Sequence, residues 1–101
     1  MTSNERSSNH RRLLFPIGAL IFSEGVDRIM REGRLDPMHY IQRHIRGDWG
    51  DVTDLRWQEN NAAVTSGKPL GSRYIVTREL TIRIVTEADR SATHVMLRSE
   101  S

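Results

Sequence analysis

The apolar pattern of the chain begins with a nearly continuous run from Leu13 to Phe22, LLFPIGALIF. This run is too short to cross a membrane, because a membrane-spanning helix needs about 20 residues. Pro16 and Gly18 interrupt it, and both residue types are common in edge strands and bent strands. We therefore expect an N-terminal strand over residues 13–22.

Two short helices are predicted next, because apolar residues at helical spacing follow two start signals. Ser23 can accept the first hydrogen bond of one helix, and Asp36 followed by Pro37 repeats the signal for another. Gly33 and Gly47 supply the matching stops. The expected helices cover residues 23–33 and 36–46.

A third helix is expected to start at Thr53 or Asp51 and to end at about Thr65, before the break at residues 66–71. The spacing of its apolar residues predicts an inner face made of Val52, Leu55, Ala62 and Ala63. Taking the apolar faces of all elements together, we predict one core that contains Ile41, Ile45, Leu55, Ile82, Ile84 and Val95.

The apolar period changes to two between Arg73 and Arg98, where β-branched residues are frequent. Residues 88–91 have turn composition and separate two alternating runs, and a weaker break falls at residues 78–79. The fold class predicted from this order is α+β. It consists of an N-terminal strand, three short helices and a three-stranded antiparallel meander, with the helices on one face of the sheet.

The distribution of charge and the amino-acid composition indicate how the chain is organised and exclude some kinds of site. Three of the fifteen basic residues and one of the thirteen acidic residues lie in residues 1–12, so residues 13–101 hold twelve of each. The predicted organisation is thus a disordered basic tail over residues 1–12 and one domain over residues 13–101. The absence of cysteine excludes disulfides and thiolate metal sites and fits a cytoplasmic protein.

Two polar segments stand at predicted junctions between elements, GDWGD at residues 47–51 and TEADRS at residues 86–91. Glycine and aspartate are unfavourable in helices and strands, and loops on a rigid scaffold often carry functional groups. An indole also suits a binding surface. The candidate partner-binding residues are Asp48, Trp49, Asp51, Trp57, Asp89 and Arg90.

A structural interpretation of the same residues competes with the functional one. Asp48 and Asp51 can be turn and cap residues, His44 can bind the last carbonyls of its helix, and Asp89 can set a turn. Arg90 would then bridge to a carboxylate. Trp49 is equally consistent with a binding contact and with a plug over the helix ends, and Trp57 is expected to be partly buried.

The two segments also carry a resemblance. Together with Arg43-His44, with Asn60 or Asn61 and with residues 84–93, they make the chain similar to a family of small uncharacterised proteins of bacterial plasmids and integrative conjugative elements. The resemblance covers roughly residues 15–98. It implies an accessory role in a mobile element, for instance against host defence, and it assigns no catalytic residue.

Three functions remain open at this point. The first is a non-enzymatic mobile-element accessory protein that binds another protein and inhibits a host defence or nucleic-acid-handling factor. The alternative is a DNA-binding winged-helix-like module that uses Arg56 and Arg90, with the arginine-containing tail as a further nucleic-acid contact. The third is a small hydrolase with an acid/base cluster of His44, Asp48 and Glu87. The sequence predicts no cofactor, no metal site and no membrane contact.

Overall fold

The computed structural model describes residues 13–100, and the predicted disordered tail at residues 1–12 lies outside this range. The elements follow one another in a strand–helix–strand order. They are β1 (Ala19–Phe22), α2 (Glu24–Arg31), α3 (Pro37–Ile45), α4 (Asp54–Ser66), β2 (Leu70–Thr77), β3 (Leu80–Thr86), β4 (Ala92–Leu97) and the 3-10 turn η1 (Arg98–Glu100). The predicted α+β class and its three helices are confirmed over this range.

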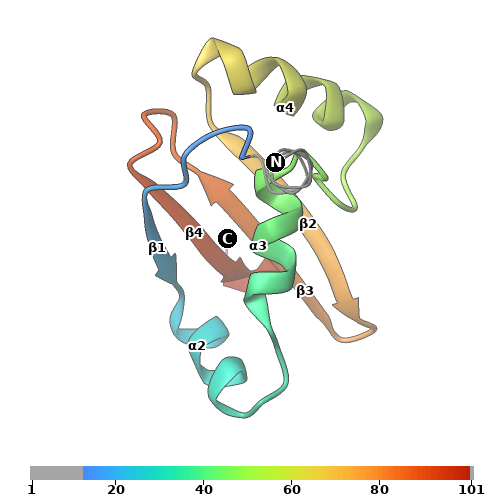
Figure 1. Ribbon diagram of the computed structural model, residues 1–101. Coiled ribbons are helices and arrows are strands. Elements are labelled where there is room, and N and C mark those ends of the chain that lie inside the picture. The colour runs from blue at the N-terminus through green and yellow to red at the C-terminus, as the bar shows by residue number, and fades with distance from the viewer. Residues whose placement is uncertain (1–12, 101) are drawn as a thin grey trace, which may run out of the picture.

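The strands form one mixed sheet in the order β1-β4-β3-β2 (Figure 1). β2, β3 and β4 pair antiparallel, which confirms the meander and its turns at residues 78–79 and 88–91. The prediction was incomplete because β1 adds to this meander, pairing parallel with β4 from Ala19 opposite Ala92 to Phe22 opposite Val95. The chain between β1 and β4 passes through three helices and then through β2 and β3. Such a long connection allows β4 to run parallel to β1.

The helix starts are where the sequence places them. The side chains of Ser23, Asp36 and Thr53 each accept a hydrogen bond from a backbone N–H of the following first turn. These bonds satisfy donors that a helix start otherwise leaves without a partner. β1, in contrast, is shorter than the predicted strand. Gly18 has a positive φ of 63°, which ends the extended conformation before Ala19.

Two apolar clusters form the core. The larger one joins α2 and α3 to the sheet and contains the predicted Ile41, Ile82, Ile84 and Val95, with Ile45 partly buried against it. The smaller one contains Phe15, Trp49, Ala63 and Leu70 and lies where α4 meets β2.

Leu55 was predicted to be in the core, and this prediction was wrong, because its side chain is 65% exposed. Of the other predicted inner residues of α4, Ala63 is buried and Ala62 is exposed, and the helix also turns Asn60 inward. The Asn60 side chain donates to the backbone oxygen of Gly71 and accepts from its backbone N–H. This pair of bonds fixes the rotation of α4 about its axis and leaves Leu55 on the outside.

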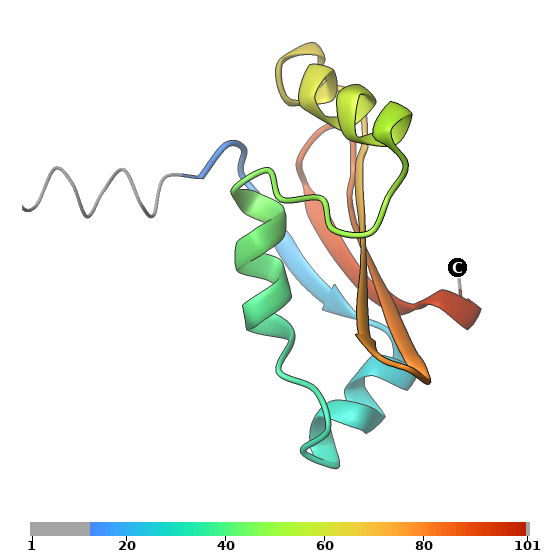
Figure 2. The ribbon, with the colours of Figure 1, turned by 90° about the vertical axis from the view of Figure 1, so that its right-hand side faces the viewer.

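Of the described helices, only α3 lies against a face of the sheet, while α4 and α2 lie at its two ends, so the prediction that the helices cover one face is confirmed in part. In Figure 2 the sheet is seen nearly edge-on, with α3 against one face and α4 across the end where β2 begins. No helix crosses the middle of the opposite face. We call this surface the open face, and its side chains come from alternate positions of the strands: Ala19, Ile21, Gly71, Arg73, Ile75, Thr81, Arg83, Val85, His94 and Met96.

Candidate functional site

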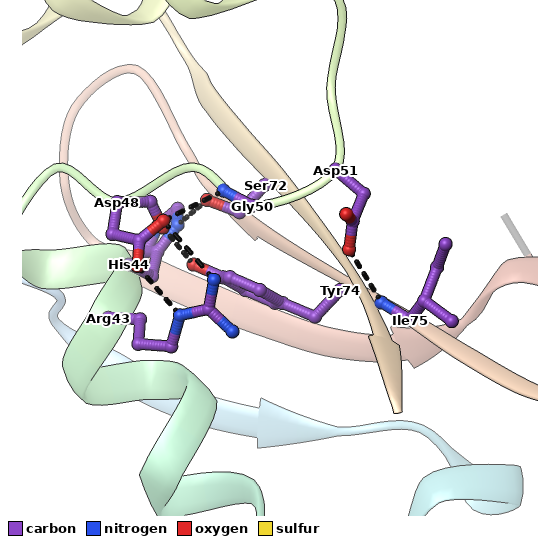
Figure 3. A network of polar contacts seen from close by, with 8 residues as sticks. All are labelled: Arg43, His44, Asp48, Gly50, Asp51, Ser72, Tyr74 and Ile75. Carbon is purple, nitrogen blue, oxygen red and sulfur yellow. Dashed lines mark hydrogen bonds and ion pairs between the residues drawn. The ribbon is translucent and has the colours of Figure 1, made fainter. Parts of the chain in front are cut away.

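The GDWGD segment lies along the outer edge of β2 and closes it (Figure 3). Gly50 forms a parallel bridge with Arg73, and Asp51 N donates to Arg73 O at 2.6 Å. The Asp51 carboxylate accepts from the backbone N–H of Ile75 at 3.0 Å. An exposed strand edge is a template for unwanted pairing. The segment therefore protects the edge of β2. Asp51 binds the backbone of β2 and does not cap α4, whose N-cap is Thr53.

Asp48 lies at the start of this segment and is held by α3. Its carboxylate accepts from Arg43 Nε at 2.8 Å and from the backbone N–H of Gly50 at 3.2 Å. The bond from Arg43 keeps the pKa of Asp48 below its usual value. The Tyr74 hydroxyl donates to Asp48 O at 2.6 Å, and burial raises the pKa of this tyrosine. These contacts confirm Asp48 as a turn residue.

Trp49 is completely buried, so the structure removes it from the candidate binding surface. Its ring stacks on Phe15 with centroids 6.0 Å apart, and its Nε1 donates to Asn61 Oδ1 at 2.9 Å. Of the two interpretations of this tryptophan, the plug is the one that the structure supports. A ring this size stabilises a small core through its buried area.

His44 was expected at the carbonyls of its own helix end, and this expectation was wrong. The ring points into the core, with Nδ1 2.6 Å from Ser72 Oγ and Nε2 2.9 Å from Thr86 Oγ1 (Figure 3 shows the Ser72 side). Thr86 Oγ1 continues the network to Thr93, whose hydroxyl donates to Ile17 O. Burial, and secondarily the positive charge of Arg90, lowers the pKa of His44 to about 3. The imidazole is therefore neutral and structural.

The TEADRS segment makes the hairpin tip between β3 and β4. Asp89 accepts from the backbone N–H of Ser91 at 3.0 Å, which confirms its predicted role in the turn. The Ser91 hydroxyl, and secondarily this backbone bond, lower the pKa of Asp89. Glu87 Oε2 lies 2.6 Å from His94 Nε2 at the surface. Asp89 and Glu87 are exposed, so they stay available for a partner.

Arg90 was predicted to bridge to a carboxylate, and this prediction was wrong. Its guanidinium donates to the backbone oxygens of Ala63 and Lys68, both at 2.8 Å, and to Glu87 O at 3.2 Å. Ala63 and Lys68 flank the end of α4, where helical carbonyls lack partners and the helix dipole favours a cation. Arg90 thus joins the hairpin tip to α4.

The acid/base cluster predicted for a hydrolase is not assembled among the described residues. Asp48 is bound to Arg43, His44 to Ser72 and Thr86, and Glu87 to His94. Ser72 and His44 form a hydroxyl–imidazole pair, but both are buried. A histidine with a pKa of about 3 is also a poor base near neutral pH.

The winged-helix interpretation loses its structural basis as well. A winged helix packs its second and third helices together as a helix-turn-helix. Here α2 packs on β4 and α4 on β2, while α3 contributes Ile41 to the cluster on the sheet.

A groove beside the open face carries four arginines, of which only Arg56 was singled out from the sequence. Arg56 from the first turn of α4, Arg73 from β2, Arg83 from β3 and Arg98 from η1 line a groove of about 450 Å³. Strand alternation contained the signal, because Arg73 and Arg83 lie out of phase with the apolar core positions of β2 and β3. We call these four residues the arginine groove.

Trp57 is partly buried, as expected, and packs against the smaller core cluster. Within residues 13–100, no helix has both the length and the apolar character that crossing a membrane requires. The same range holds no group of three or more His, Cys, Asp or Glu residues that could bind a metal ion. Comparisons with protein-family models, curated proteins and solved structures gave no match to this chain.

Proposed function

We propose that this protein is a non-enzymatic accessory protein that acts by binding another protein through the open face of its sheet. The observation that carries the proposal is the exposure of this face. Ile75 is 60% exposed and Ile21 is 44% exposed on a surface with no helix across its middle. The two isoleucines lie on the two edge strands of this face, with Val85 and Met96 between them on β3 and β4. Apolar groups spread over an exposed face are typical of interaction sites.

The GDWGD and TEADRS segments support a binding site on the open face, because most of their candidate residues are already engaged within the chain. Trp49 is buried, and Asp48, Asp51 and Arg90 bind other parts of the chain. Their contacts stabilise the scaffold, which leaves the open face and the exposed acidic groups of the hairpin tip to meet a partner. In a mobile element, the partner would be a host protein of defence or nucleic-acid handling, which the accessory protein inhibits by occupying its surface.

Site-specific photo-crosslinking in the natural host tests the proposal. A benzophenone amino acid replaces Ile75 or Ile21 on the open face, and Met38 on α3, which is 47% exposed, is the matched control. We expect one discrete crosslinked protein from both open-face positions and not from Met38. Equal products from Met38, or crosslinks to nucleic acid alone, would contradict the proposal.

A further inference from the structure

We infer that the arginine groove binds an acidic segment of the partner protein, so that carboxylates of the partner lie between α4 and the open face. This inference rests on the proposed function and specifies the chemistry of the partner. Four of the residues that line the groove are arginines, and none of the lining residues is acidic. Arginine binds carboxylates through two parallel hydrogen bonds, which gives such a site geometric selectivity.

Two of the groove's like charges lie on directly paired strand positions. Arg73 on β2 and Arg83 on β3 are direct cross-strand partners. Like charges at such positions destabilise a sheet. Arg73 Nε donates to Asp51 O at 3.0 Å, whereas Arg83 has no ion-pair partner within residues 13–100. A bound anion would remove the repulsion between the two guanidinium groups.

The contacts of Arg56 and of the nearby Asp51 carboxylate leave positive charge in the groove uncompensated. Arg56 approaches Glu59 only to 3.9 Å, with both side chains more than half exposed, so this pair is weak. The carboxylate of Asp51 is directed to the N–H of Ile75. Thr53, the N-cap of α4, also lines the groove, so the positive end of the helix dipole adds to the attraction for an anion, although Asp54 in the first turn offsets part of it.

The rest of the open face favours a protein over a nucleic acid. Ile21, Ile75, Val85 and Met96 share this face with the arginines, whereas Phe22 and Tyr74 lie on the other face and the one ring of the four strands on this face, His94, is bound to Glu87. Single-stranded nucleic acid is bound on aromatic stacking platforms, which this face lacks. Arginine and methionine beside apolar residues are instead enriched in protein interfaces. The matching partner segment combines carboxylates with apolar side chains.

The test is a fluorescence-polarisation titration of the full chain with three labelled probes. The first is a 12-residue peptide of glutamate with leucine at every third position, the second has glutamine in place of glutamate, and the third is a 12-nucleotide single-stranded DNA. The groove variant is Arg73→Gln/Arg83→Gln. The matched control is Arg31→Gln/Arg34→Gln, which removes the same charge from exposed residues of ion pairs outside the groove.

We expect the glutamate peptide to bind and the glutamine peptide not to bind. The groove variant should lose at least tenfold in affinity for the glutamate peptide, and the control less than about twofold. Melting curves will show that both variants are folded. Equal loss in both variants, or no binding of the glutamate peptide at millimolar concentration, would overturn the inference.

Two further outcomes would also overturn it. Tighter binding of the oligonucleotide, lost in the groove variant, would assign the groove to nucleic acid. Dimers in light scattering that dissociate in the groove variant would assign the face to a second copy of the chain. The crosslinking from Ile21 and Ile75 is independent of these titrations, so a crosslinked partner with a neutral or basic contact segment would refute the acidic segment while the proposed function stands.

Discussion

Gly50 lies directly against Arg73 at the outer edge of β2, in a parallel bridge that no other described segment makes with this edge. Its φ is +78°, and a Cβ at this position would collide with Arg73 O and with the ring of Tyr74. Only glycine suits both the conformation and the space. The edge closure by residues 49–51 therefore depends on this one residue.

Gly50→Ala should lower the free energy of unfolding by about 2–5 kcal/mol, because left-handed strain and overpacking add. Gly33→Ala is the matched control. Gly33 has a φ of +73°, but a Cβ added there would meet no atom within 4 Å, so only the strain of about 1–2 kcal/mol remains. Urea unfolding of both variants measures the difference. Equal losses would show that the contact with Arg73 and Tyr74 is unimportant.

The buried His44 makes stability depend on pH. Its pKa is about 3 in the folded chain and 6.5 in an unfolded one. Between these values the unfolded chain binds a proton that the folded chain excludes, so stability is complete above the unfolded pKa and declines as the pH falls. The slope is about 1.4 kcal/mol per pH unit.

Denaturant unfolding from pH 7 to about pH 5 isolates this contribution, because carboxylates such as Asp48 protonate mainly at lower pH. His44→Gln should be less stable than wild type at pH 7, but its stability should change little across this range. His39→Gln, at an exposed position of α3, should keep the wild-type slope. An unchanged slope in His44→Gln would refute the assignment.

The sequence was informative where the structure depends on neighbours along the chain. Ser23, Asp36 and Thr53 begin their helices through bonds within the next three residues, and such bonds follow from residue type alone. The tip at residues 88–91 follows in the same way from its turn composition. Alternation also placed Ile82 and Ile84 in the core.

Predictions failed where distant residues decide the outcome. The rotation of α4 depends on bonds between Asn60 and Gly71, and a weak amphipathic pattern in this helix gave no competing signal, so Leu55 was misplaced. The inward direction of His44 depends on hydroxyls that β2 and β3 supply. Arg90 was paired with a carboxylate because local charges suggested it, whereas the end of α4 supplies backbone oxygens that lack helical partners.

Arg90 supports a prediction about the link between the hairpin tip and α4. Arg90→Ala should lower the free energy of unfolding by about 1–3 kcal/mol, because three backbone oxygens lose a charged donor. Arg78→Ala, at the exposed β2–β3 turn, should stay within about 0.5 kcal/mol of wild type. Chemical denaturation gives both values. Wild-type stability of Arg90→Ala would mean that these bonds contribute little.

The cross-strand pair of Arg73 and Arg83 gives the last prediction, which concerns the protein without a partner. Removing one of two like charges that face each other should stabilise the sheet, so Arg83→Thr should raise the free energy of unfolding by about 0.2–1 kcal/mol at low salt. Threonine is chosen because it is favoured in strands.

The gain should shrink as salt approaches 1 M, where the screening length is about 3 Å. Arg34→Thr removes the same charge from an exposed pair with Glu32 and should show no gain, because the partner it loses is a carboxylate. Thermal unfolding at two salt concentrations measures both variants. If Arg83→Thr instead lowers the free energy of unfolding by more than about 1 kcal/mol, Arg83 stabilises the sheet in the free protein. Its charge would then need no bound anion to offset it.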